Sequence, residues 1–182
     1  IYTDEELEDA AGQIISYALG ILLGRWKKNG SQEHILSLRN DKSINQIESK
    51  ISELFGDSSN IVASIQNALG RGVEDWLNNR FFRYHHTKEY RRRGQRIPVY
   101  WQLESPDGAF SCLIYYHKID MNTLPKLRGQ YLDPRIGELE NELETLNAQT
   151  SGENPDKDLL NRKEEVQDDL EDVKEFRETI DE

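Results

Sequence analysis

The amino-acid sequence predicts a mainly α-helical fold with a small β-hairpin, an α+β arrangement that ends in an antiparallel, coiled-coil-like helical hairpin. Three observations lead to this prediction. Apolar residues recur at helical spacing over most of the 182 residues, and the spacing changes to alternation between about residues 97 and 116. After residue 134, two further apolar stripes are joined by a glycine- and proline-containing loop. We therefore expect a helical domain with the hairpin at 1–133, and an acidic helical hairpin at 134–182.

The first helix has a well-defined predicted start. Thr3 can cap the helix, and Glu6 stands three residues later, which together make a capping box. Apolar residues then follow at helical spacing as far as Leu22. We expect the helix to end at residues 29–31, which read NGS.

Two more helices are predicted between residues 43 and 69. Residues 31–42 are polar and predict no element. Ser43 can cap the second helix, Gly56 separates it from the third, and the GRG sequence at 70–72 ends the third helix. The expected buried positions on these two helices are Ile44, Ile47, Ile51, Leu54, Ile61, Val62, Ile65 and Leu69.

A fourth helix is predicted over about residues 73–83. It would bury Trp76, Leu77 and Phe81. We expect it to continue through two adjacent histidines to Arg93.

The alternating segments predict a β-hairpin. Residues 97–104 and 109–116 each alternate at a period of two, and the sequence SPDG at 105–108 lies between them. Proline presets φ, aspartate favours the turn and glycine accepts a positive φ. Tyr100 and Trp101 fit the alternation, so we expect both to pack in the core.

The C-terminal part is predicted to be helical throughout. A short helix is expected at about 123–131, and Pro134 is expected to break the chain. The following apolar stripes indicate two helices that pack against each other across the loop at 151–155. The stripe residues are Ile136, Leu139, Leu143 and Leu146, then Leu159, Val166, Leu170, Val173, Phe176 and Ile180.

The charge is distributed very unevenly. The net charge of −11 belongs to residues 134–182, which hold 17 acidic and 6 basic side chains, whereas residues 1–133 hold 17 of each. Within that neutral part, residues 80–96 hold seven Lys or Arg and one Glu. Such a basic, aromatic-rich segment is typical of a surface that neutralises nucleic-acid phosphates. The candidate nucleic-acid-binding residues are Arg80, Arg83, His86, Lys88, Arg91, Arg92, Arg93 and Arg96.

Other interpretations of this basic segment remain open. Tyr84, His85, His86 and Tyr90 could stack on bases or form hydrogen bonds. Alternatively, residues 91–93 could be a solvated helix end near the negative pole of the helix dipole, or the segment could pair with the acidic tail.

The sequence contains no recognisable catalytic or metal motif. There is no glycine-rich cofactor loop, no phosphate-binding loop and no Cys/His spacing for zinc. The one cysteine, Cys112, lies in a strand pattern and is expected to be a small core residue. No apolar run is long enough to span a membrane and no secretory signal is visible, so we expect a cytoplasmic protein. Because no catalytic motif is recognisable, we also expect that the chain is not itself an enzyme. Because the chain begins at Ile1, we expect it to be a piece of a longer protein.

Several short blocks resemble a known family. Residues 96–103 read RIPVYWQL, and GAFS at 108–111 and LIYYH at 113–117 follow. Upstream, residues 15–20 read ISYALG and residues 23–26 read LGRW. These blocks resemble the C-terminal region of large bacterial N6-adenine DNA methyltransferases, the family that includes the BREX phage-defence methyltransferase PglX and methylase subunits of related restriction systems.

Further positions agree with this resemblance. The spacing Phe82-x-x-x-His86-x-x-x-Tyr90 is similar to an aromatic-His-Tyr run of the family, and the later sequence pairs at 127–128 and 131–132 occur in the expected order. The chain departs from the family pattern at Trp26, where tyrosine is usual, and at Lys118, where arginine is commoner.

The resemblance implies a role in methyl transfer from S-adenosylmethionine to adenine N6. That chemistry needs a cofactor-binding glycine motif and an Asn-Pro-Pro-Tyr-type tetrapeptide, and the chain contains neither. The resemblance therefore implies an accessory module without cofactor or catalytic residues. It would contact double-stranded DNA, or assist target recognition, beside the catalytic domain of the parent chain. The alternative is a protein-interaction scaffold, in which the acidic helical hairpin docks another subunit of the defence system.

Overall fold

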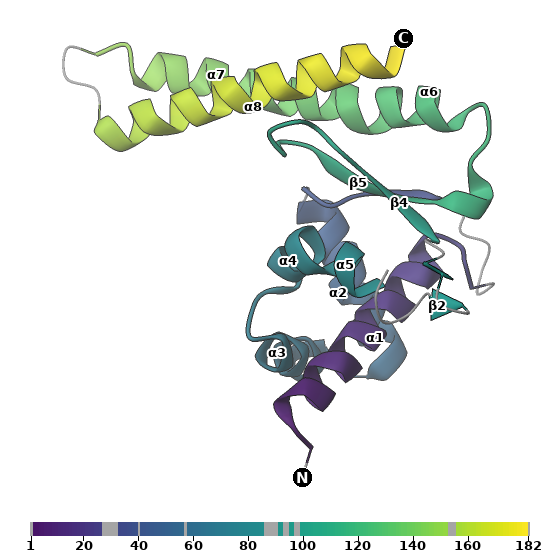
Figure 1. Cartoon of the computed structure of the whole chain (residues 1–182). Coiled ribbons are helices and arrows are strands. Elements are labelled where there is room, and N and C mark those ends of the chain that lie inside the picture. The colour runs from purple at the N-terminus through teal and green to yellow at the C-terminus, as the bar shows by residue number, and fades with distance from the viewer. Residues whose placement is uncertain are drawn as a thin grey trace. The chain divides into compact units, whose positions relative to one another are not determined.

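The structure is a computed structural model of the chain, and it describes residues 2–26, 33–39, 41–56, 58–85, 91–92, 95–96, 99–152 and 156–181. By packing, the chain divides into two compact units. The first comprises Ile1–Leu103 and Cys112–Ile119, and the second comprises Glu104–Ser111 and Asp120–Glu182. The mainly helical α+β fold is confirmed (Figure 1). The domain boundary expected near residue 134 concerns independent folding and stays a prediction.

The first helix, α1 (Asp4–Leu22), begins as predicted. Thr3 accepts a hydrogen bond from the backbone N–H of Glu6, and the Glu6 carboxylate accepts one from the N–H of Thr3. The expected end at residues 29–31 is wrong, because the helix ends at Leu22. Gly24 adopts a φ of 69°, and the Arg25 N–H donates to the Gly20 carbonyl at 2.7 Å, a reversal that only glycine accommodates without strain.

Helices α2 (Asp41–Phe55) and α3 (Ser58–Leu69) pack against α1 and build most of the core of the first unit (Figure 1). Their predicted apolar stripes are confirmed. Ile47 and Ile51 are fully buried, and Ile65 and Leu69 are buried from the third helix. Gly70, with a φ of 64°, ends α3 as expected.

The fourth predicted helix is split into three short elements in continuous helical conformation: α4 (Val73–Trp76), the π-helical turn η1 (Leu77–Phe81) and α5 (Phe82–Tyr84). The expected continuation to Arg93 is wrong. Arg91–Arg92 form the short strand β2, which pairs antiparallel with β3 (Gln95–Arg96).

A three-stranded sheet completes the first unit. Its strand order is β1-β5-β4, where β1 is Ile35–Ser37, β4 is Tyr100–Glu104 and β5 is Ser111–Tyr115. Ile35 pairs with Ile114, and Ser37 pairs with Cys112. The hairpin β4–β5 is confirmed, whereas β1 was not predicted, because a buried strand of three residues is too short to show a period.

The two aromatic residues at the start of β4 have different environments. Tyr100 is fully buried, as predicted, but Trp101 is 45% exposed, so the expectation that it packs in the core is wrong. Successive residues of a strand point to opposite faces of the sheet, so the rings of Tyr100 and Trp101 cannot both pack against the core on one face.

Cys112 is a core residue, as predicted. It is fully buried, and burial raises the pKa of its thiol to about 12, although a backbone hydrogen bond with Leu103 acts in the opposite direction. The thiol is therefore protonated at neutral pH and is a poor nucleophile.

The C-terminal helices do not break at Pro134. Helix α6 (Thr123–Leu127) leads through the π-helical turn η4 (Arg128–Leu132) into α7 (Asp133–Gln149) in continuous helical conformation. The expectation of a break is therefore wrong. A proline inside a regular helix clashes with the carbonyl of the preceding turn, and the wider π-helical turn just before Pro134 accommodates its ring.

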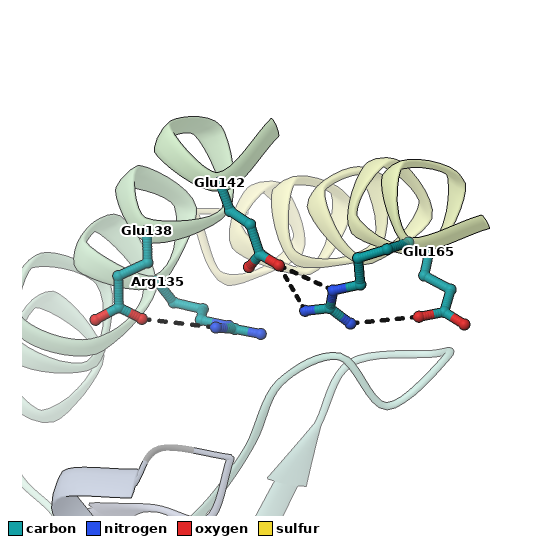
Figure 2. A network of polar contacts seen from close by, with 5 residues as sticks. Arg135, Glu138, Glu142 and Glu165 are labelled. Atoms are coloured by element: carbon teal, nitrogen blue, oxygen red, sulfur yellow. Dashed lines mark hydrogen bonds and ion pairs between the residues drawn. The ribbon is translucent and has the colours of Figure 1, made fainter. Parts of the chain in front are cut away.

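Helices α7 and α8 (Lys157–Asp181) form the predicted antiparallel helical hairpin (Figure 1). Leu139 and Leu146 face the buried Val166, Leu170 and Val173 stripe of the partner helix. Three ion pairs join the two helices: Arg162 with Glu142 at 2.8 Å, Lys174 with Glu140 at 2.7 Å, and Arg177 with Asp133 at 2.6 Å. Glu165 adds a second carboxylate to Arg162 (Figure 2).

The turn of the β-hairpin belongs to the same unit as these helices, and Asp172 of α8 holds it. The Asp172 carboxylate accepts hydrogen bonds from the Ser105 hydroxyl at 2.5 Å and from the N–H groups of Asp107 and Ala109, both at 3.0 Å. Burial opposes the charge of Asp172, but these three donors outweigh it, so the pKa of the carboxyl lies below its usual value.

In the described ranges, none of the helices combines the length and apolar character of a membrane span.

Replacing Asp172 tests this contact. We expect Asp172→Asn to lower the free energy of unfolding by about 2–4 kcal/mol, because buried donors lose a charged acceptor. Hydrogen exchange of the Asp107 and Ala109 amides should accelerate in the same variant.

The pH dependence gives an independent check. Because the pKa of Asp172 is lower in the folded protein than in the unfolded chain, its carboxylate stabilises the fold at pH values above the unfolded pKa of about 3.9. This contribution is lost as the pH falls through the folded pKa. The stabilities of the original chain and of Asp172→Asn should therefore converge at low pH. The exposed Asp168→Asn is the matched control, and an equal effect of both substitutions would contradict the assignment.

Candidate nucleic-acid interface

Two of the predicted phosphate-binding residues lie on the helical segment before the strands. Arg80 is in η1 and Arg83 is in α5, and both side chains are exposed. The opposite side of the same segment is fixed in the core by Trp76, Leu77 and Phe81. The burial pattern therefore leaves the two arginines on the solvent-facing side, three residues apart, where their side chains are neighbours.

The aromatic residues that follow have structural positions. The hydroxyl of Tyr84 donates to the carbonyl of Asp9 at 3.2 Å, and its ring lies 5.4 Å from that of Trp76. His85 is fully buried, with its ring 5.4 Å from Phe81 and 4.8 Å from Tyr100. The interpretation that His85 stacks on bases is therefore wrong, since its ring is fully buried, whereas the same interpretation for the partly buried Tyr84 stays a prediction.

Two residues that flank most of the basic segment in the sequence, His85 and Tyr100, contact each other. His85 and Tyr100 are both fully buried, and their rings lie 4.8 Å apart. Six of the eight candidate residues lie between these two positions in the sequence. We refer to residues 86–99, whose flanking residues His85 and Tyr100 contact each other, as the basic excursion.

The strands β2 and β3 lie within this excursion. Their register places Arg91 opposite Arg96, and Arg92 opposite Gln95. Only the backbone of these four residues is described, and His86, Lys88, Tyr90 and Arg93 lie outside the described residues. Contact between the candidate residues and phosphate therefore stays a prediction.

An exposed aromatic cluster lies immediately after the basic segment. It consists of Trp101 on β4, and Tyr116 and His117 just after β5. The rings of Trp101 and Tyr116 are 5.6 Å apart, those of Tyr116 and His117 are 5.3 Å apart, and Trp101 and Tyr116 are 45% and 47% exposed. The sequence analysis missed this cluster as a site. The alternation of β4 shows only that Tyr100 and Trp101 point to opposite faces of the sheet, and no local signal shows which face is left exposed.

The other sequence block, around residues 15–26, is explained by packing. Gly20 has no side chain because the indole of Trp26 occupies that space: a Cβ atom there would lie 2.5 Å from Nε1 of Trp26. The guanidinium of Arg25 lies 4.3 Å from the centre of the indole ring, at cation–π distance. This block fixes the end of α1 and adds no reactive group to the candidate interface.

Within the part of the chain that the structure describes, no group of three or more His, Cys, Asp or Glu side chains could hold a metal ion. Among the described residues, the candidate interface consists of the exposed cations Arg80 and Arg83 and the exposed rings of Trp101, Tyr116 and His117.

Comparison with known proteins identifies relatives over part of the chain. No protein-family model matches it. It is 31% identical over 88 residues to the adenine-specific methyltransferase PglX of Lacticaseibacillus casei (strain Zhang), a match that covers 46% of this chain and 7% of that protein. It is also 31% identical over 78 residues to the adenine-specific methyltransferase BrxX of Escherichia coli O9:H4 (strain HS), which covers 42% of this chain and 6% of that protein. The predicted relationship to PglX-like adenine-specific methyltransferases is confirmed.

The different environments of Tyr100 and Trp101 predict different costs of substitution. We expect Tyr100→Ala to lower the free energy of unfolding by about 3–5 kcal/mol, because it removes a fully buried ring against Phe81, His85 and Tyr115. Trp101→Ala should cost about 1 kcal/mol or less, because nearly half of its surface is already in water. Urea unfolding measures both, and equal losses would show that Trp101 is a core residue.

Proposed function

We propose that this chain is a DNA-contacting accessory module of an adenine-specific DNA methyltransferase that serves a restriction or phage-defence system. Two named methyltransferases are its relatives, and each match covers less than a tenth of the relative's length. The sequence has neither an Asn-Pro-Pro-Tyr-type tetrapeptide nor a cofactor-binding glycine motif. We therefore expect S-adenosylmethionine and the catalytic residues to belong to another part of the parent enzyme.

The observation that carries this proposal is the basic excursion closed by His85 and Tyr100. Residues 86–99 hold five Lys or Arg and one Glu, a net charge of +4 in a chain whose total is −11, and Arg80 and Arg83 stand shortly before them. Repulsion among so many cations opposes a compact arrangement unless an anion compensates it. A DNA backbone supplies that anion as a regular array of phosphates.

The register of β2 and β3 adds to this support. It pairs Arg91 with Arg96, and like charges at directly opposite positions destabilise a two-stranded ribbon. Phosphate bound to this ribbon would remove the repulsion.

Contacts of this kind are independent of base sequence. Arginine and lysine side chains on phosphates fix the position of a protein on the duplex, whereas base edges determine specificity. We propose that the module holds the duplex for the catalytic domain of the parent chain and leaves target selection to other residues.

Salt dependence tests the proposal. The 182-residue chain should bind duplex DNA with an affinity that falls as salt rises, because each arginine bound to a phosphate displaces counterions. We expect Arg80/Arg83→Ala and Arg91/Arg92/Arg93→Ala to weaken binding about tenfold or more at low salt. Each should also reduce the slope of log K against log salt by about one for every phosphate-binding arginine that is replaced. Fluorescence anisotropy over a salt series measures both quantities.

The matched control keeps the charge. Arg91/Arg92/Arg93→Lys should retain most of the salt slope, because lysine still neutralises phosphate. Arg80 and Arg83 are exposed positions of helical conformation, where alanine is the most favourable residue, and thermal unfolding of the alanine variants checks that the fold is retained. An unchanged slope in both alanine variants would reject the DNA-contact role.

The acidic helical hairpin favours a second candidate function, the docking of another protein subunit. Four of its six basic residues are engaged in ion pairs with its own carboxylates: Arg135, Arg162, Lys174 and Arg177. The remaining carboxylates give an outward surface of excess negative charge. Four exposed ones follow helical spacing along α8 and so share one face: Glu164, Asp168, Glu171 and Glu175.

Charge reversal on that face tests docking. We expect replacement of these four residues by lysine to weaken association with the methyltransferase domain of the parent enzyme at least tenfold, because like charges would then face a basic partner surface. Titration calorimetry measures the association. Replacement by Gln and Asn should give an intermediate loss, and unchanged association in both variants would eliminate the scaffold role.

A further inference from the structure

The exposed aromatic cluster of Trp101, Tyr116 and His117 is not explained by the fold. Neighbouring Tyr100 is fully buried, whereas Trp101 and Tyr116 leave nearly half of their surfaces in water. Large rings contribute most to stability when buried, so a contiguous set of exposed rings indicates a binding surface.

The cluster is held on a rigid support. The N–H of Tyr116 donates to the carbonyl of Val99 at 2.9 Å, and the N–H of Tyr115 donates to the carbonyl of His34 at 2.8 Å. Trp101 lies on β4, which pairs with the central strand β5. Because the sheet fixes these backbones, little conformational entropy is lost when a flat ligand stacks on the rings.

The cluster is also close to the basic segment along the chain. Arg96 and Trp101 are separated by five peptide units, so their Cα atoms lie within about 17–18 Å of each other. Lys118 directly follows His117. A ligand that has both a flat aromatic group and a negative charge can therefore contact the rings and the cations together.

We propose that Trp101, Tyr116 and His117 form a stacking site for an unpaired nucleic-acid base. Aromatic side chains bind bases through their faces, and adjacent cations bind the linking phosphates. This inference rests on the proposed function, in which the neighbouring arginines contact the DNA backbone. It adds a base-dependent interaction to one that depends on phosphate alone.

The test uses two single strands of about 12 nucleotides, one of thymidine and one in which every base is replaced by an abasic sugar. The strands share their phosphates and differ in their bases. We expect Trp101→Ala to weaken binding of the thymidine strand roughly 5- to 150-fold, and to leave binding of the abasic strand unchanged. Tyr116→Ala should have the same selective effect.

Two further variants serve as controls. Trp101→Phe should retain binding of the thymidine strand within about threefold, because phenylalanine still offers a ring face, and it should abolish the fluorescence quenching caused by that strand. Phe55→Ala removes an aromatic residue of similar exposure, 46%, from the end of α2 and should change neither affinity. Thermal unfolding of each variant checks that the fold is retained.

The outcomes separate this inference from the proposed function. Equal losses on both strands, or no loss on the thymidine strand, would overturn the stacking site even if the arginine variants behave as expected on duplex DNA. If the arginine variants leave duplex binding unchanged, the backbone role fails, whatever the base-dependent effect of Trp101.

Discussion

The first unit depends on the close approach of aromatic rings to helix α1 at two glycines. A Cβ atom at Gly12 would lie 2.8 Å from Cζ of Tyr84, and one at Gly20 would lie 2.5 Å from the indole nitrogen of Trp26. A larger residue at either position would displace a ring, the partly buried Tyr84 at Gly12 and the 42% exposed Trp26 at Gly20. These contacts hold the end of α5 and the turn after α1 in place.

A continuous series of rings extends from that contact to the sheet. Trp76 lies against Tyr84 and Phe81, Phe81 against His85, and His85 against Tyr100, which also contacts Tyr115. The ring series is entirely buried at Phe81, His85 and Tyr100. It therefore fixes both ends of the basic excursion with the same packing that forms the core. The buried rings fix the positions of His85 and Tyr100, and the cations that lie between these two residues in the sequence carry the positive charge.

Local signals predicted much of the fold, and interactions between distant segments account for most of what they missed. The Thr3 capping box, the stop at Gly70 and the hairpin turn at Gly108 depend on residues within a few positions, so the sequence reveals them directly. The strand β1 is defined by its pairing with β5, which lies far along the chain, and no local period marks it. The basic segment could be recognised from its composition. The exposed cluster at Trp101 and Tyr116 could not, because burial on either face of a strand is decided by what packs on each face.

The order of strands in the sheet has a consequence for synthesis of the protein. β5 lies between β1 and β4 but is the last of the three in the sequence, so β1 and β4 have no sheet partner until residues 111–115 leave the ribosome. Until then the backbone of β1, with its buried apolar Ile35 and Leu36, is an open edge that can pair with other nascent chains. A polypeptide truncated before Ser111 would lack β5 and keep this edge permanently, so aggregation in cells is its expected fate even though helices α1 to α3 are all present.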